Sequence, residues 1–300
     1  MTKLNTAIIG YGNIGKSIYE AITASGDMAI SGVVLRDKTT AQAKGVPAHL
    51  TVAQSIEDLG RVDIAYLCIP SREVPKTAAD LLAKGINTVD SYDIHSDIYD
   101  LQQKLAPIGK AHNAAAIISA GWDPGTNSMI RGILEAAAPK GLTYTNFGPG
   151  MSMGHTVAVK AIPGVKDALS ITIPTGTGLH RRMVYIEVHD KNNFPAISDA
   201  IKQDPYFIND DTHVLLSDDV NALMDKGHGV NLVRKGVSGT TDNQLFEFNM
   251  RINNPALTAQ IMVAAGRAAV RQAGGCYTLL EVPIIDMLPG KREGIIRRLV

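Results

Sequence analysis

Gly10-Tyr11-Gly12-Asn13-Ile14-Gly15 lies directly after an apolar run at 6–9 and directly before a helical pattern at 16–24. A strand, a glycine-rich turn and the start of a helix form the context of a dinucleotide-binding motif. In that motif Gly10 permits the tight turn, Gly12 lets the backbone approach a pyrophosphate, and Gly15 lets the helix pack on the strand. The phosphates bind free N–H groups at the positive end of the helix. The alternative is a chance glycine turn, and the strand–turn–helix context favours the cofactor.

The composition sets limits on the class of protein. Three hundred residues, 45% of them apolar, suffice for one large domain or two ordinary ones. The 29 basic and 29 acidic residues cancel, so no basic field favours nucleic acid or an anionic membrane surface. No apolar run reaches membrane-spanning length, and the first strand begins too near Met1 for a secretory signal.

The two cysteines, Cys68 and Cys276, follow neither a disulfide-scaffold spacing nor a metal-binding spacing. We therefore expect two reduced thiols in a cytoplasmic protein. No histidine or cysteine spacing indicates a metal, and we expect none.

The first 120 residues alternate short apolar runs with helical stretches. Strands are expected at 30–35, 63–69, 86–89 and 115–119, and helices at 74–83 and 98–105. This alternation is typical of a doubly wound, mostly parallel sheet with helices on both faces, a Rossmann-type α/β fold.

The pattern of apolar and polar residues changes after Gly121. Strand-like pieces at 142–147, 168–173, 183–188 and 245–252 alternate apolar with polar residues, which suits a half-buried antiparallel or mixed sheet. Helices are expected at 128–138, 155–162 and 195–202, and a late helix at 255–272 has Asn254 as its N-cap. We expect a dinucleotide-binding domain at 1–121, rejoined by 255–300, and an α+β substrate-binding domain at 122–254.

Open parallel sheets bind ligands at the carboxyl ends of their strands. In this chain those ends bear Gly10, Arg36, Ser71, Asp93 and Asp123. The order of the strands therefore predicts where the site lies.

Arg36 follows the second expected strand, where an acidic residue would bind a ribose 2′-hydroxyl and an arginine accommodates a 2′-phosphate. Leu35 has no group that binds a hydroxyl, whereas a guanidinium pairs with phosphate in bidentate fashion, so the sequence favours NADP. Two alternatives stay open: Arg36 is only a solvated surface charge, or the adjacent Asp37 weakens the preference.

Asp93 and Asp123 are expected at neighbouring strand ends, where two carboxylates are suited to hold a substrate ammonium group beside the nicotinamide. The alternative for each is a helix cap, and Asp123 before Pro124 is a natural one.

Two further features are suited to bind the carboxylates of a substrate. The glycine-rich loop at 148–155 leads into a helix whose amides can receive a carboxylate, unless it is only a turn with methionines as core filler. The basic cluster at 180–182 can clamp a second carboxylate, unless it is a solvated charge run. His228, between two glycines, is more often a loop histidine than a ligand.

The whole chain resembles the meso-diaminopimelate dehydrogenase family. The motifs that carry the resemblance are GYGNIG at 10–15, TVDSYDIH at 88–95, SAGWDPGTNS at 119–128, FGPGMSMGH at 147–155, KAIPGVKDALSITIP at 160–174 and MRINNPALTAQ at 250–260. The resemblance implies a homodimer that catalyses NADP-dependent, reversible oxidative deamination at the D-centre of meso-2,6-diaminopimelate. The products would be L-2-amino-6-oxopimelate, ammonia and NADPH, on the route to lysine and cell-wall peptide.

The resemblance also implies roles for individual residues. Contacts at the reacting end would come from Asp93, Trp122, Asp123, Phe147, Met153 and Gly154, with Asp93 and Asp123 as the catalytic candidates. Contacts at the distal L-amino-acid end would come from Thr172, Arg182, His228 and Asn254. Together with the strand-end map, the expected NADP-binding residues are Gly10, Tyr11, Gly12, Asn13, Ile14, Gly15, Arg36, Cys68, Ile69, Pro70, Ser71, Ser91, Tyr92, Ala120, Gly121, Trp122 and Pro124.

This chain departs from the family pattern at three places. Phe147 stands where other members have a tryptophan, Asp37 replaces one of the two arginines that some members have after the second strand, and the segment between Pro174 and His180 is short compared with some relatives. The short segment resembles the subgroup that tolerates other D-amino acids, so the sequence is also compatible with a broader D-amino acid dehydrogenase. A different Rossmann amino-acid dehydrogenase and a protein that binds NADP without catalysis stay open as well.

Overall fold

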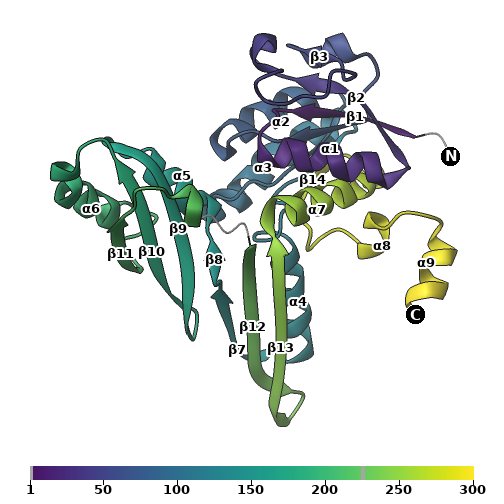
Figure 1. The fold of residues 1–300 in the computed structure, drawn as a ribbon. Helices are drawn as coiled ribbons and strands as arrows, with labels where there is room; N and C mark the ends of the chain where they lie inside the picture. Colours follow the sequence, from purple (N-terminus) through teal and green to yellow (C-terminus); the bar gives the residue numbers. More distant parts are fainter. Residues whose placement is uncertain (1–2, 224–226) are drawn as a thin grey trace. The chain divides into compact units, whose positions relative to one another are not determined.

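The computed structural model describes residues 3–223 and 227–300. The chain divides into two compact units, unit 1 with Met1–Gly132 and Pro255–Val300, and unit 2 with Ile133–Asn254 (Figure 1). Among the described residues, no helix combines the length and the apolar character needed to cross a membrane.

Unit 1 is built on a seven-stranded parallel sheet in the order β14-β6-β5-β4-β1-β2-β3. Its strands are β1 (Leu4–Ile9), β2 (Met28–Val34), β3 (Val52–Ala53), β4 (Ile64–Leu67), β5 (Asn87–Asp90), β6 (Ala115–Ile117) and β14 (Gly275–Tyr277). The order reverses direction at β1, as in doubly wound folds. The predicted Rossmann-type α/β fold is confirmed.

Helices cover both faces of this sheet because alternate strand residues point to opposite sides. On β4, Ile64 and Tyr66 pack into one apolar cluster with α1 (Asn13–Ser25) and α7 (Asn254–Ala269). Ala65 and Leu67 pack into a second cluster with α2 (Val74–Leu82) and α3 (Ile98–Ala111). Unit 1 also holds the short helices η1 (Lys38–Thr40), η2 (Ile56–Leu59), η3 (Ser71–Glu73), η4 (His95–Asp97), α8 (Ile284–Met287) and α9 (Arg292–Leu299).

Unit 2 contains two smaller sheets, to which α4 (Thr126–Ala137) leads from unit 1. The four-stranded sheet β11-β10-β9-β8 is mixed, because β10 and β11 run parallel and its other pairs antiparallel. The sheet β13-β12-β7 is antiparallel throughout. The elements are β7 (Lys140–Phe147), β8 (Gly150–Met151), α5 (Met153–Lys160), β9 (Val165–Gly176), β10 (Leu179–Val188), η5 (Lys191–Asn193), α6 (Phe194–Gln203), β11 (Asp211–Leu216), η6 (Asn221–Leu223), β12 (Gly227–Ser238) and β13 (Thr241–Asn253).

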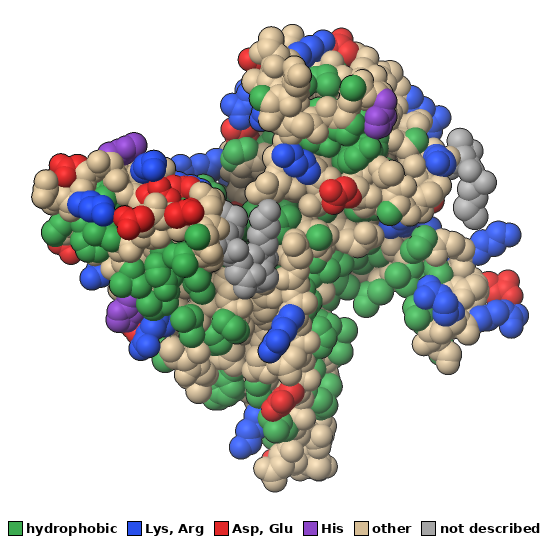
Figure 2. All heavy atoms as spheres, viewed as in Figure 1, with side chains coloured by type: hydrophobic (Ala, Val, Ile, Leu, Met, Phe, Trp, Pro, Cys, Tyr) green, Lys and Arg blue, Asp and Glu red, His purple; other side chains and the backbone are tan. Residues whose placement is uncertain are grey.

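The α+β character of unit 2 is as predicted, with α5 and α6 packed on the mixed sheet around Val159, Ile201 and Phe207. Figure 2 shows basic and acidic side chains scattered among one another on the face drawn, as expected from equal numbers of the two charges.

Several boundaries differ from the sequence predictions. The helix predicted at 98–105 continues through Pro107 to Ala111, because proline leaves only the carbonyl of the exposed Gln103 without its helical partner. The late helix ends at Ala269 rather than at 272. Strands β3, β8, β11, β12 and β14 were not predicted. Strands β3 and β8 have two residues each, and β12 and β14 contain glycines that weaken the strand signal.

Gly266 on α7 lies against the fully buried ring of Tyr66 on β4. A Cβ built at Gly266 would lie 2.1 Å from the Tyr66 Oη and 2.9 Å from its Cζ. We expect Gly266→Ala to lower the free energy of unfolding by about 1–3 kcal/mol, because overpacking outweighs the better helix propensity of alanine.

Gly294→Ala on α9 is the matched control, since a Cβ there would meet no atom within 4 Å. Urea denaturation should find this control as stable as the original chain or more stable by up to about 1 kcal/mol. Equal stability of the two variants would contradict the close packing of α7 on β4.

Candidate functional site

The turn between β1 and α1 has the geometry of a phosphate cradle. A Cβ at Gly10 would lie 2.5 Å from the Cys68 carbonyl oxygen, and a Cβ at Gly15 would lie 2.5 Å from the Gly10 carbonyl oxygen. A Cβ at Gly12 would meet nothing within 4 Å, so its absence leaves the backbone open to a ligand. The turn therefore fits a pyrophosphate at the N-terminus of α1.

A cavity of about 540 Å³ opens beside this turn. It is lined from the ends of β1, β2 and β4, and of the predicted cofactor residues it brings together Gly10, Tyr11, Gly12, Arg36, Cys68, Ile69 and Pro70. Asn13, Ile14 and Gly15 form the first turn of α1, and Ser71 begins η3. Ser91, Tyr92, Ala120, Gly121, Trp122 and Pro124 follow β5 and β6.

The charges in this cavity include one that sequence analysis missed. An Arg36 Nη2 lies 2.5 Å from both carboxylate oxygens of Glu73, at the end of η3. Asp37 instead accepts hydrogen bonds from the Thr39 N–H at 2.9 Å and the Thr39 hydroxyl at 2.6 Å, which holds its pKa below the usual range. Asp37 is thus engaged in its own turn, and Glu73 is the acid that faces Arg36.

The loops after β5 and β6 carry the two carboxylates expected at the reacting end. Asp93 accepts a hydrogen bond from the Ser71 hydroxyl at 2.6 Å. Asp123 lies 2.9 Å from Arg131 on α4, next to the buried Trp122. Within the described part of the chain neither carboxylate accepts a hydrogen bond from a helix amide, so the helix-cap alternative gains no support.

Unit 2 gathers polar residues around Arg182 on β10. Thr172 on β9 is the antiparallel partner of Arg182, and the Arg182 Nη1 donates to the Thr172 hydroxyl. The Arg182 Nε donates to Asp210 at 2.6 Å. His180 lies two residues earlier on the same face of β10, whereas Arg181 points to the other face and pairs with Asp211. The basic run at 180–182 is therefore divided between two faces.

The histidines near Arg182 are held neutral. His228, the second residue of β12, is 7% exposed, and burial and the Arg182 charge lower its pKa to about 4. The same two causes lower the pKa of His155 on α5 to about 4 and lower the pKa of His180. Near neutral pH these rings offer hydrogen bonds, while Arg182 supplies the positive charge for a carboxylate.

The remaining predicted substrate residues lie at the ends of elements in unit 2. Phe147 ends β7, where its N–H donates to the His180 Nε2 at 2.8 Å and its ring centroid lies 5.5 Å from that of His180. Met153 and Gly154 begin α5, next to the 2.7 Å hydrogen bond between the Ser152 hydroxyl and the His155 Nδ1. Asn254 follows β13 as the first residue of α7.

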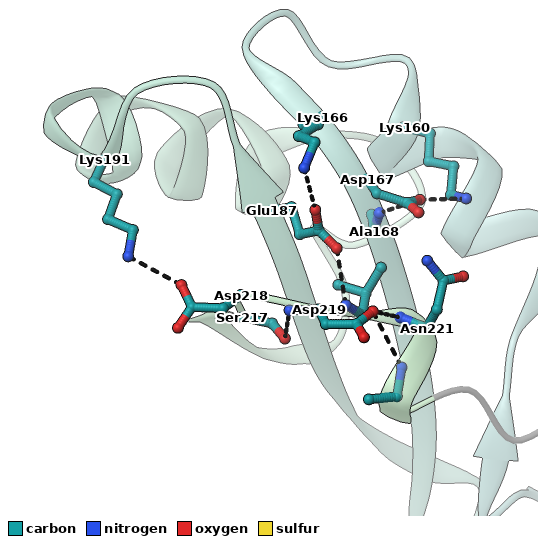
Figure 3. A network of polar contacts seen from close by, with 12 residues as sticks. Lys160, Lys166, Asp167, Ala168, Glu187, Lys191, Ser217, Asp218, Asp219 and Asn221 are labelled. Atoms are coloured by element: carbon teal, nitrogen blue, oxygen red, sulfur yellow. Dashed lines mark hydrogen bonds and ion pairs between the residues drawn. The ribbon is translucent and has the colours of Figure 1, made fainter.

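A polar network holds the loop at 217–223, which precedes β12 in the chain (Figure 3). Glu187 on β10 accepts hydrogen bonds from Lys166 at 2.8 Å and from the Val220 N–H at 3.0 Å. Asp219 accepts a hydrogen bond from the Asn221 N–H at 2.9 Å. The bond from the Val220 N–H to Glu187 fixes the loop to the mixed sheet, and the bond to Asp219 closes a turn within the loop.

The site residues that sequence analysis did not identify include Glu73, Arg131, His155 and Asp210. Glu73 and Asp210 lie far in sequence from the arginines that they bind, and no spacing pattern links them. His155 is the last residue of the glycine-rich loop motif, and its place in that motif was the only sequence feature that pointed to it. Among the described residues, no group of three histidine, cysteine or acidic side chains could hold a metal.

The chain is similar to known dehydrogenases over its whole length. The model of the diaminopimelic acid dehydrogenase C-terminal domain matches residues 121–179, and that of the CoA binding domain matches residues 1–91. The chain is 61% identical to a meso-diaminopimelate D-dehydrogenase of Bacteroides fragilis over the full length of both chains. It is 31% identical to that of Corynebacterium glutamicum over 99% of each chain.

Two solved structures are similar over their whole length. C. glutamicum DAP dehydrogenase in complex with DAP superposes with a TM-score of 0.90 at 30% identity, and covers 100% of both chains. An engineered D-amino acid dehydrogenase bound to NADP+ superposes with a TM-score of 0.85 at 28% identity, also over 100% of both chains.

The low pKa of His155 predicts acid sensitivity. The ring is neutral in the folded chain down to about pH 4, whereas in the unfolded chain it gains a proton below about pH 6.5. The fold therefore loses stability as the pH falls from about 6.5 to 4. We expect His155→Asn to shrink the loss of unfolding free energy between pH 7.5 and pH 5 by about 1–2 kcal/mol, as measured by urea denaturation.

His112→Asn is the control, because His112 is an exposed histidine after α3. It should keep the pH dependence of the original chain. An unchanged pH dependence in His155→Asn would mean that His155 is not held neutral by its surroundings.

Proposed function

The chain belongs to the meso-diaminopimelate D-dehydrogenase family, and we propose that it deaminates meso-2,6-diaminopimelate oxidatively at its D-centre, with NADP as cofactor. The products are L-2-amino-6-oxopimelate, ammonia and NADPH, and the reaction is reversible. The observation that carries the proposal is the full-length 61% identity to a relative named for this activity.

The surroundings of Arg182 support the proposal that the substrate carries a second carboxylate far from the reacting carbon. The Arg182 side chain is 11% exposed, and its guanidinium is held at Nε by Asp210 and at Nη1 by Thr172, so among the described residues Nη2 remains for a ligand. Arg182 binds the distal carboxylate, His228 donates a neutral hydrogen bond, and Thr172 and Asn254 are polar partners. A charge-assisted pair with such a mostly buried guanidinium is strong.

The cofactor is held by the glycine cradle and by Arg36. The open backbone at Gly12 receives the pyrophosphate, and Arg36 leaves the exposed pair with Glu73 for the 2′-phosphate. An exposed ion pair contributes little, so its loss is a small cost. The nicotinamide of NADP supplies the hydride acceptor when it is bound.

The reacting ammonium is bound by Asp93 and Asp123. Asp93 is fixed by Ser71 and Asp123 by Arg131, so both carboxylates are oriented before the substrate arrives. The family resemblance also assigns substrate contacts to Trp122 in unit 1 and to Phe147, Met153 and Gly154 in unit 2. Either carboxylate, or an ordered water, moves the protons that accompany deamination.

We also propose that the enzyme is a homodimer. On the sheet β13-β12-β7, Leu142 and Leu245 both pair with Lys235 and so lie in one row, and both leucines are more than half exposed. Two large exposed apolar side chains on either side of a lysine stem are suited to a surface that a second subunit covers.

The function is tested by an absorbance assay at 340 nm. With NADP, the meso isomer of diaminopimelate should be oxidised and the L,L isomer should not, because the L,L isomer has no D-carbon to react. Comparable turnover of both isomers would contradict the stereochemical proposal. No turnover of the meso isomer would favour another amino-acid dehydrogenase or a protein that only binds NADP.

Arg36→Ala tests the cofactor assignment. We expect NADP to be preferred over NAD by at least about tenfold, because a charge-assisted phosphate contact contributes roughly 1.5–3 kcal/mol. The variant should raise the KM for NADP and leave the kinetics with NAD nearly unchanged. An equal loss with both cofactors would reject a contact with the 2′-phosphate.

Arg182→Ala tests whether Arg182 binds the distal carboxylate of the substrate without taking part in the reaction at the D-carbon. Loss of the pair with the distal carboxylate should cost about 2–4 kcal/mol in kcat/KM for meso-diaminopimelate. Activity on D-alanine, which has no distal carboxylate, should survive or rise. The matched control is Arg181→Ala, because Arg181 is the next residue of β10 but pairs with Asp211 on the other face. Equal losses on both substrates in Arg182→Ala would contradict the role.

A further inference from the structure

Asp90, the last residue of β5, joins two loops through one side chain. Its Oδ1 accepts hydrogen bonds from the Tyr92 N–H and the Ser119 N–H, each at 3.0 Å. Its backbone carbonyl accepts a third, from the Ala120 N–H at 2.7 Å. The loop after β5 and the loop after β6 therefore share one anchor.

These loops carry the proposed reacting-end residues. Asp93 lies three residues beyond Asp90, and Trp122 and Asp123 lie three and four residues beyond Ser119. The short links leave little freedom for either carboxylate once its loop is anchored. The distance between the two loops at their roots depends on the oxygen that both amides share.

The backbone at Ser119 requires such support. Its φ of 54° places a non-glycine residue in the left-handed region, which costs free energy and persists only when the surroundings enforce it. The hydrogen bond from the Ser119 N–H to Asp90 is a contact that enforces it.

Burial of the Asp90 carboxylate lowers the free energy of unfolding. Asp90 is fully buried, its Oδ2 has no partner among the described residues, and burial raises its pKa to about 6 despite the two N–H donors. An apolar side chain would cost less at this place in the sheet. The benefit of an aspartate lies in what its oxygen holds in place.

We propose that Asp90 is a positioning residue for the reacting end, which sets the relative placement of Asp93 and Asp123 through the two backbone amides without touching the substrate. This rests on the proposed function for the roles of Asp93 and Asp123. The anchoring of the loops can be measured without turnover.

Trp122 provides that measurement, because it is the one tryptophan of the chain and is 6% exposed on the anchored loop. In the full-length chain without cofactor, Asp90→Ala should shift the Trp122 emission to longer wavelength and increase its quenching by acrylamide. Its kcat/KM for meso-diaminopimelate should fall tenfold or more. Asp90→Asn keeps an acceptor oxygen, so emission should match the original chain and kcat/KM should stay within about threefold.

Thr88→Val is the matched control. Thr88 lies two residues earlier on β5, on the same face, fully buried and with a hydroxyl that has no partner in the described chain. The variant is close in shape and holds no loop, so emission and kinetics should be unchanged whatever happens to the melting temperature.

Unchanged emission and kinetics in Asp90→Ala would overturn the proposal, as would equal effects of the alanine and asparagine variants. If Asp90→Ala does not fold, Asp90→Glu replaces it, because the longer side chain moves the acceptor and should shift emission and lower kcat/KM. Normal behaviour of Asp90→Glu would then overturn the proposal. An original chain inactive on meso-diaminopimelate would refute the proposed function, while Trp122 emission would still decide whether Asp90 anchors the loop.

Discussion

The close approach of backbone to backbone at the turn between β1 and α1 is the constraint on which unit 1 depends. At Gly10 and Gly15 a single added carbon would lie 2.5 Å from a carbonyl oxygen, so no other residue lets the helix start this near the sheet. The ends of β1, β2 and β4 then meet around one cavity. The position of Arg36 relative to the phosphate cradle follows from this arrangement.

The two units present opposite charges to a ligand. Unit 2 surrounds the one guanidinium of Arg182 with histidines that burial keeps neutral, which suits the binding of an anion. Unit 1 presents carboxylates at its strand ends, each oriented by a neighbour, which suits a cation. The anion-binding groups of unit 2 and the cation-binding groups of unit 1 each fit the chemistry of diaminopimelate, the substrate for which the family is named.

Much of the fold was accessible from the sequence because it is encoded locally. Alternating apolar runs predicted the parallel sheet, and the strand ends predicted the edge that carries the cofactor cavity. The prediction failed where a local rule was overridden. Helix α3 passes through Pro107 since the affected carbonyl is exposed to water, and β12 forms in spite of its glycines because β7 and β13 pair with it on both sides.

The sequence by itself determined the glycine turn, the order of the elements and the residues at the strand ends, since each depends on neighbours a few positions away. The tertiary structure alone decided which charges meet. Glu73 is 37 residues from Arg36, Asp210 is 28 from Arg182, and Ser119 is 29 from Asp90. Such partners come together only through strand order and register, as when parallel pairing of β10 with β11 sets Arg182 beside Thr212 and brings Asp210 within reach. Local periodicity carries no information about that pairing, and the chemistry of the site depends on it.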